Sequence, residues 1–253
     1  MLSDTRLRAG LASATARLAA VVAVTDEATR VPSCPDWSLR QLTGHVGRVH
    51  RWAGEIVNRR SAGMLDFREA PDGKLPGALA DRADWLTAGA DRFAAAVDGA
   101  AGEQMWTWLG PGPAGYWLRR MAHETGVHAA DAELAVGSLT PMDADLAADA
   151  LDEMLGFATA LRSGGPVPAL EPGATLHLHA TDDGLDGAGE WLITVLPAGI
   201  GVRPGHQKAD IALRGPAATL LLVLTRRLAP DQPGVDVLGD AALLTPWLEV
   251  TRL

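Results

Sequence analysis

The sequence predicts an α+β protein, in which a helical N-terminal half is followed by a smaller domain of mixed strands and helices. Apolar residues recur at helical spacing through most of residues 1–160. Strand-like alternation and β-branched residues begin after residue 168. The intervening segment, residues 162–168, is rich in glycine and proline and is typical of a linker. These observations predict one domain over residues 1–162 and a second over residues 168–253.

Five helices are predicted in the N-terminal half. The first covers residues 4–28 behind a cap candidate at Ser3 or Asp4, and the second starts after a cap candidate at Asp36 or Ser38 and runs to about Arg60. Two prolines between them end the first pattern, because proline lacks the N–H that a helix needs. The other helices are predicted over residues 79–98, 115–136 and 143–161, with a turn at 110–113. Amphipathic helices joined by short links indicate an antiparallel bundle.

The C-terminal part is predicted to alternate short strands with helices. Strands are expected over residues 176–180, 191–196, 210–213 and 235–238, and helices over residues 216–227 and 240–249. His177 and His179 lie two residues apart on one face of the first of these strands. That spacing fits a metal-binding pair, but two surface residues are the more common explanation.

Composition excludes several classes of protein. The formal net charge is −9 and there is no basic run, which disfavours nucleic-acid binding. Cys34 is the only cysteine, so an internal disulfide and a multi-cysteine metal site are both excluded. No stretch approaches the roughly 20 uninterrupted apolar residues of a membrane span, and charges spread through residues 1–28 argue against a signal peptide. We therefore expect a cytoplasmic protein without a membrane partner.

A candidate metal site begins with Glu124 and His128. Residues four apart on a helix lie only about 40° apart around its axis, so a carboxylate and an imidazole can converge on one ion. His123 is five residues from His128, about 140° away, and cannot easily share that ion. The pair alone also fits a surface contact or a hydrogen bond within the helix. Asp131, three residues further on, fits either an acceptor that orients His128 or a solvated carboxylate.

A third ligand is expected from the second helix, because catalytic zinc sites take three protein ligands and leave one position open. His45 continues the apolar stripe of this helix, whereas His50 is about 140° away and lies between arginines. His45 is therefore the better candidate, although a lone helical histidine is often a core or surface residue. Oxygen and nitrogen ligands without a thiolate suit zinc, nickel or ferrous iron.

Two motifs resemble those of a known family. Cys34-Pro-Asp-Trp-Ser-Leu-Arg-Gln-Leu-Thr-Gly-His45-Val-Gly and His123-Glu-Thr-Gly-Val-His128-Ala-Ala-Asp131 are similar to signatures of the mycothiol-dependent maleylpyruvate isomerase family. The resemblance implies a DinB-like antiparallel four-helix bundle followed by a small sterol-carrier-like α+β domain. It also implies that His45, Glu124 and His128 bind zinc or another divalent metal. A more diffuse match around Gly215 and the Leu-rich helix after it implies that Arg227 contributes to activity and to cofactor binding.

The resemblance implies an enzyme that uses a low-molecular-weight thiol, mycothiol, as its cofactor. The expected activity is a metal-dependent isomerase or S-transferase that acts on a small electrophile, in a monomer or homodimer. Two alternatives stay open at this point. One is a non-catalytic binding or regulatory protein, and the other is a metal-dependent hydrolase whose ligands hold a water of lowered pKa.

Overall fold

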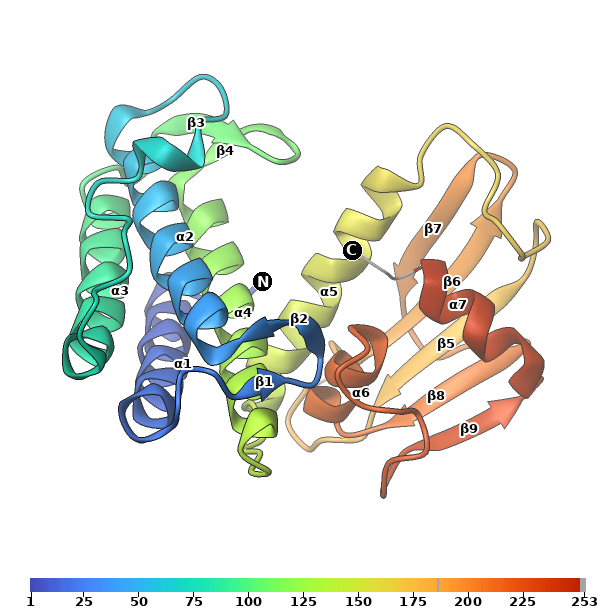
Figure 1. Cartoon of the computed structure of the whole chain (residues 1–253). Coiled ribbons are helices and arrows are strands. Elements are labelled where there is room, and N and C mark those ends of the chain that lie inside the picture. The colour runs from blue at the N-terminus through green and yellow to red at the C-terminus, as the bar shows by residue number, and fades with distance from the viewer. Residues whose placement is uncertain (186, 251–253) are drawn as a thin grey trace. The chain divides into compact units, whose positions relative to one another are not determined.

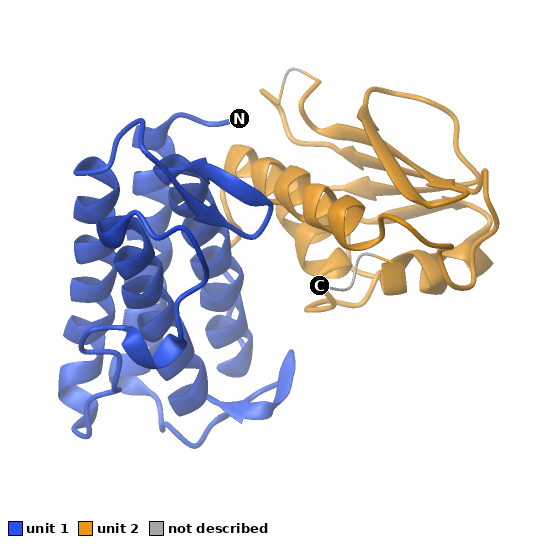
Figure 2. Cartoon of the chain, turned by 90° about the horizontal axis from the view of Figure 1, so that it is seen from above, with its two compact units in different colours: residues 1–140 blue, residues 141–253 orange. Residues whose placement is uncertain are grey.

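The computed structural model describes residues 1–185 and 187–250 and divides into two compact units, Met1–Thr140 and Pro141–Leu253 (Figure 2). The first unit is helical and the second is built on a sheet, which confirms the predicted α+β class. The position of the boundary differs from the predicted linker at residues 162–168. Helix α5 (Ala144–Leu161), which the sequence assigned to the helical domain, belongs to the second unit because it packs against α6 and β7 of that unit.

Four α-helices make up most of the first unit, all within residues that the structure describes: α1 (Asp4–Val24), α2 (Leu39–Arg59), α3 (Arg82–Asp98) and α4 (Ala114–Ala135). Helices α1 and α2 each pack against both α3 and α4 (Figure 1). One residue from each helix, Leu18, Leu42, Leu86 and Ala129, is fully buried in a shared cluster. The apolar stripes that predicted the helices therefore form the core of this unit.

The helix starts follow local capping chemistry. Ser3 accepts a hydrogen bond from the backbone N–H of Arg6 at 3.2 Å and caps α1. Ser38 forms a capping box with Gln41 at the start of α2, in which the backbone N–H of Ser38 donates to Gln41 Oε1 at 2.6 Å. This cap fixes the first turn of the helix that carries His45.

Two short hairpins replace segments that the sequence predicted to be irregular. Strands β1 (Arg30–Val31) and β2 (Cys34–Ser38) pair just before α2, and β3 (Gln104–Thr107) pairs with β4 (Gly110–Pro113) just before α4. The predicted break at 31–36 does separate α1 from α2, although most of it lies in strands, whereas the turn predicted at 110–113 is strand β4. Their prolines suggested the absence of strands, but a two-stranded ribbon tolerates proline because only half of its backbone donors face the partner strand.

A five-stranded sheet with the order β7-β6-β5-β8-β9 forms the centre of the second unit (Figure 1). Strands β5 and β8 are parallel and the other neighbours are antiparallel. The sheet is accompanied by three α-helices within the described residues. The bounds are β5 (Thr175–Ala180), β6 (Glu190–Leu196), β7 (Gly199–Pro204), β8 (Ile211–Gly215), β9 (Asp236–Gly239), α6 (Ala217–Leu224) and α7 (Leu244–Val250). The sequence located every one of these strands except β7, whose two glycines and proline resemble a turn.

Among the described residues, one helix, α1, is long and apolar enough to cross a membrane by length and composition. Its apolar side chains are instead used inside the unit, where Leu7, Leu11 and Leu18 are almost completely buried. Its Arg17 makes a two-pronged ion pair with Glu133 of α4, with nitrogen–oxygen distances of 2.9 and 2.6 Å. These are the contacts of a core helix.

Candidate metal centre

Helices α2 and α4 bring His45, Glu124 and His128 together, and we call these three residues the helical site. His45 Nε2 lies 3.1 Å from Glu124 Oε1, and His128 Nε2 lies 3.2 Å from the same oxygen. One ligand atom from each residue lies within 4.8 Å of the other two. The two imidazole rings meet edge to face with their centroids 5.0 Å apart.

These distances fit a divalent metal ion. Zinc lies roughly 2.0–2.2 Å from imidazole nitrogen and carboxylate oxygen, so neighbouring ligands of a tetrahedral ion lie about 3.3–3.5 Å apart. The two measured separations are only slightly shorter than that range. Two imidazoles and one carboxylate also match the three-ligand donor set of a catalytic zinc site, which leaves one position for another molecule.

Two further side chains hold the ligands in place. Asp131 is completely buried, and its Oδ2 lies 2.8 Å from His128 Nδ1. Of the two alternatives that the sequence left open, Asp131 is therefore the acceptor that orients His128 and directs its Nε2 toward the site. Arg120 donates to Glu124 Oε2 at 2.7 Å, which leaves Oε1 for an ion. Ser33, from the loop between β1 and β2, donates to the other oxygen of Asp131.

The charges of the helical site are strongly coupled. Burial alone would raise the pKa of Glu124, but hydrogen bonds to His128 and His45 and the nearby charge of Arg120 lower it well below its ordinary value. Burial alone would lower the pKa of His128, but hydrogen bonds to Asp131 and Glu124 raise it to about 9. The carboxylate is thus ionised at neutral pH, and a metal ion has to displace a proton from His128.

The other histidines of the first unit lie outside this site. His50 is buried, and its Nε2 donates to Thr125 Oγ1 at 2.7 Å. The Thr125 hydroxyl donates in turn to the carbonyl of Met121 at 2.6 Å, so it can only accept from His50. His123 is buried as well, and neither residue is part of the group whose ligand atoms converge. The structure therefore places the two histidines where the helical spacing predicted, away from the ligand face.

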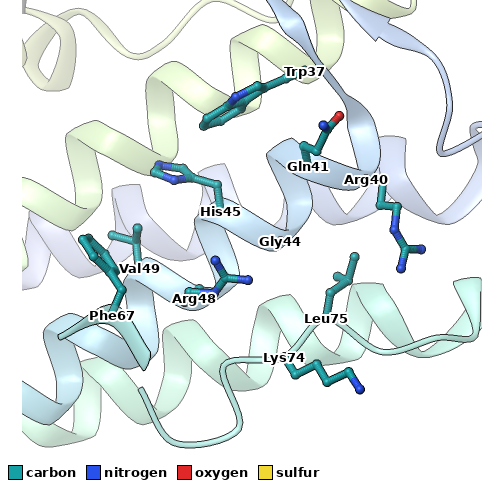
Figure 3. A pocket seen from close by; sticks show the side chains of 10 residues that line it. All are labelled: Trp37, Arg40, Gln41, Gly44, His45, Arg48, Val49, Phe67, Lys74 and Leu75. Carbon is teal, nitrogen blue, oxygen red and sulfur yellow. The ribbon is translucent and has the colours of Figure 1, made fainter. Parts of the chain in front are cut away.

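A groove of about 720 Å³ opens beside His45 on the surface of the first unit. Figure 3 shows Trp37 and Phe67 on either side of His45, with the side chain of Arg48 one turn further along α2. Lys74, from the segment before α3, also lines the groove. The Trp37 ring lies 5.0 Å from that of His45, centroid to centroid. The groove thus combines aromatic surface with positive charge.

Sequence reasoning missed this groove. The position of Arg48, three residues after His45 and so on the same side of the helix, was an available signal. Phe67 and Lys74 carried no such signal, because their place depends on how the long connection between α2 and α3 folds over α2.

Arg227 lies in the second unit, just after α6. Its backbone N–H donates to the carbonyl of Leu222 at 2.7 Å, and its guanidinium Nη1 donates to the carbonyl of Thr225 at 2.8 Å. Arg226, with a left-handed φ of 63°, turns the chain at this point and forms an ion pair with Glu249. Of the two neighbouring arginines, Arg226 is exposed and Arg227 is half-buried, with its side chain folded back toward the end of α6.

Comparisons with known proteins agree with this architecture. The model of the mycothiol maleylpyruvate isomerase N-terminal domain matches residues 9–133, and that of the MDMPI C-terminal domain matches residues 145–246. A crystal structure of the mycothiol-dependent maleylpyruvate isomerase is similar at 15% identity, with a TM-score of 0.61 and 93% of each chain covered. A mutant of that enzyme gives 14% identity, a TM-score of 0.60 and the same coverage. At this identity the two structures establish the fold alone. No protein with a curated function matches the sequence.

Proposed function

The chain belongs to the mycothiol maleylpyruvate isomerase family, and from this premise we propose that it is a metal- and thiol-dependent isomerase or S-transferase acting on a small electrophile. The observation that carries the proposal is the convergence of His45, Glu124 and His128, with Asp131 supporting His128. We propose zinc as the metal, mycothiol as the thiol and the cytoplasm as the location, for a monomer or homodimer.

The chemistry of the helical site supports a thiol-dependent reaction. A divalent ion held by three protein ligands supplies a positive charge that lowers the pKa of a thiol in its open position. The residues of the chain then have three tasks. His45 and His128 present nitrogen lone pairs, Glu124 contributes one negative charge, and Arg120 holds the second oxygen of that carboxylate away from the ion.

The residues that line the groove beside His45 favour a particular class of substrate. Arg48 and Lys74 place two positive charges beside the aromatic surfaces of Trp37 and Phe67. A small, flat electrophile that carries a carboxylate would find both a surface to pack on and a cation to pair with. We propose that Arg48 binds the anionic group of the electrophile, because it projects from the same helix as the ligand His45.

A mutation tests the proposed role of Arg48. Arg48→Gln should raise the KM for an anionic electrophile about tenfold or more while the metal content stays the same. Arg40→Gln is the matched control, since Arg40 also lines the groove but is paired with Glu27 at 2.8 Å. An unchanged KM in Arg48→Gln would remove this residue from substrate binding.

Arg227 is proposed to bind a carboxylate of the thiol or of the substrate. Arg227→Lys keeps the charge but loses the two-pronged geometry of the guanidinium. Titration calorimetry with mycothiol should therefore show weaker binding to Arg227→Lys than to the wild type, with the metal retained. Equal affinity would exclude Arg227 from thiol binding.

Turnover with maleylpyruvate as the first electrophile tests the proposed activity as a whole. The zinc-loaded protein should isomerise or conjugate electrophiles only when the thiol is present, and His45→Ala should abolish the reaction. Thiol-independent hydrolysis by the same metal-loaded protein would favour the hydrolase alternative instead. Retention of metal without any binding of thiol would favour a non-catalytic role.

A further inference from the structure

A second group of metal-ligating side chains lies in the second unit, at one end of the β5–β6 pair. It consists of His177, His179, Glu190 and His206, which we call the sheet site. Glu190 Oε2 is at its centre. This oxygen lies 2.6 Å from His206 Nδ1, 3.1 Å from His177 Nε2 and 4.0 Å from His179 Nδ1.

The sheet brings three of these residues together through its register. Side chains alternate between the two faces of a strand, so His177 and His179 share one face of β5, while Leu176 and Leu178 occupy the other. His179 is directly opposite Glu190 of β6, and residues directly opposite in an antiparallel pair point to the same face. His177 reaches Glu190 diagonally across the same pair.

A turn after β7 brings in the fourth residue. Gly205 has a φ of +119°, a conformation that other residues rarely adopt, and its backbone N–H donates to the carbonyl of Glu190 at 3.0 Å. This contact anchors the turn beside Glu190 and places His206 over the carboxylate. The Arg203 guanidinium donates to Gln207 at 2.6 Å and braces the turn from its other side.

The donor set and spacing match a transition-metal site. Each of the four residues offers one ligand atom, and all four atoms lie within 4.8 Å of one another. Neighbouring ligands of tetrahedral zinc lie about 3.3–3.5 Å apart, and the three distances from Glu190 bracket that range. Imidazole nitrogens with one carboxylate suit zinc and its first-row neighbours, rather than the oxygen-rich sites that calcium and magnesium prefer.

We propose that the sheet site binds a second divalent metal ion, of the zinc class, in addition to any ion in the helical site. Four protein ligands fill a tetrahedral shell, which is the arrangement of structural zinc. The ion ties the turn after β7 to strands β5 and β6. Because the unfolded chain does not hold these ligands together, metal binding there stabilises the fold of the second unit.

Metal counting in full-length variants separates the two sites. After dialysis against excess zinc and then against metal-free buffer, the wild type should retain one ion for each of the two clusters. His45→Ala should lose only the ion of the helical site. His45→Ala combined with His179→Asn and Glu190→Gln leaves only two histidines at the sheet site and should lose both ions. If this combined variant retains as much zinc as His45→Ala, the sheet site does not bind metal. If instead the helical site does not bind metal, the wild type retains one ion fewer than expected, and His45→Ala retains as much zinc as the wild type.

His206→Ala guards against a result caused by misfolding. The His206 side chain is 71% exposed, so its removal should leave the circular dichroism spectrum and the Tm in chelator unchanged. Zinc should raise the Tm of the His45→Ala protein, and His206→Ala in that background should remove most of this rise. Lys208→Ala, two residues away in the same segment and also exposed, is the matched control and should respond to zinc as its parent does. Equal responses of all three proteins would overturn the proposal.

Glu190→Gln distinguishes a metal site from a hydrogen-bonded cluster. The amide preserves the size of the side chain but removes the charge that an ion requires. Loss of a hydrogen bond that only supports a metal ligand lowers metal affinity by roughly 10–100-fold. Because Glu190 is proposed as a ligand itself, zinc affinity should fall by at least that factor. Cobalt(II) bound by the His45→Ala protein should show the intense visible absorption of four-coordinate cobalt, and this absorption should disappear in Glu190→Gln. Retained absorption would exclude Glu190 as a ligand and contradict the proposal.

Discussion

The chemistry of the helical site depends on which nitrogen each histidine presents. His128 directs Nε2 into the site because Asp131 holds its Nδ1, whereas His50 uses Nε2 to bind Thr125. Two histidines on facing helices thus have different tasks, although both are buried. Three predictions follow from individual side chains.

Removal of a ligand should release the metal, whereas removal of a neighbouring histidine should not. His45→Ala and His128→Ala are expected to lose most zinc affinity, and His50→Ala and His123→Ala should retain it in the folded protein. The reason is that the latter two point about 140° away from the ligand face. Elemental analysis of protein purified without a metal-affinity tag measures this. Release of zinc by His50→Ala but not by His45→Ala would mean that the other face of α2 binds the ion.

Asp131 should contribute to affinity without being a ligand. Asp131→Asn keeps the side-chain volume but weakens the charged hydrogen bond that orients His128. Zinc affinity should fall by about 10–100-fold. Competition with a coloured chelator measures the zinc affinity of this variant and of the wild type. Ser33→Ala, which removes only the hydrogen bond to the other oxygen of this carboxylate, should cause a smaller loss. Full affinity in Asp131→Asn would show that the charge of Asp131 does not contribute to metal binding.

His50 should make the fold sensitive to acid. Its burial and the adjacent charge of Arg51 lower its pKa to about 3 in the folded protein, against about 6.5 in the unfolded chain. Between these values the unfolded state binds the extra proton, so the free energy of unfolding falls as the pH drops below about 6.5 and the loss ends near pH 3. Over two pH units the effect is on the order of 2–3 kcal/mol.

Urea denaturation in the presence of chelator, at several pH values from about 6.5 to 4.5, tests this contribution. His50→Gln keeps a donor for Thr125 but cannot be protonated, so its stability should decline less steeply with acid than that of the wild type. Parallel declines in the two proteins would assign the acid sensitivity to other groups.

At the scale of elements, the close approach of α2 and α3 supports the helix that carries His45. The Trp85 ring of α3 occupies the space where a side chain at Gly47 would lie, since a Cβ there would be only 2.0 Å from the ring. Arg51 lies over the same ring, 4.2 Å from its centroid, and its guanidinium donates to the carbonyls of Gly47 and Trp85 at 2.8 Å. This contact requires glycine at position 47.

Gly47→Ala should therefore destabilise the protein by about 1–3 kcal/mol, because Trp85 has to move out of a packed interface. Gly54→Ala on the same helix is the matched control. Its Cβ would meet Phe93 at an ordinary distance of 3.6 Å, so alanine should cost little or stabilise α2 by up to about 1 kcal/mol. Thermal unfolding of both variants measures the difference. Equal Tm values would contradict the account of this interface.

Local signals explain which elements could be predicted from the sequence. Caps such as Ser3 and Ser38, together with apolar periodicity, located the α-helices to within a few residues. The two hairpins and β7 were missed because their prolines and glycines resemble turns until a partner strand is known. Pairing between distant segments supplies the missing hydrogen bonds, and a single segment does not reveal its partner.

Across the whole molecule, spacing along the helices was enough to select the three residues of the helical site, but not the residues that surround it. Glu124 and His128 share a face of one helix by spacing alone, and the stripe of α2 selected His45 over His50. The role of Asp131 depended on burial, which the sequence left open. The spacing of His177 and His179 suggested a metal-binding pair but did not identify its partners. Lys74, Glu190 and His206 depend on how other segments of the chain fold against helices and strands, so neither spacing nor composition could locate them.

The two metal-ligating clusters give the units of this chain different expected tasks. In our proposals, three ligands at the helical site would leave room for a thiol, whereas four ligands at the sheet site would close the shell around an ion. The family assignment rests on matches that cover residues 9–133 and 145–246, and thus on both units. We accordingly expect both parts to be needed for activity, the first for metal chemistry and the second for Arg227.

The proposed function requires that the helical site hold a metal ion that binds a thiol, and calorimetric titration of mycothiol measures this binding. The titration is carried out on three samples, namely the zinc-loaded wild type, the same protein after chelation, and zinc-treated His45→Ala. We predict saturable binding of one thiol per chain to the first sample, with release of a proton, and no binding to the other two. Equal binding of mycothiol to the zinc-loaded and metal-free wild type would contradict the proposed function.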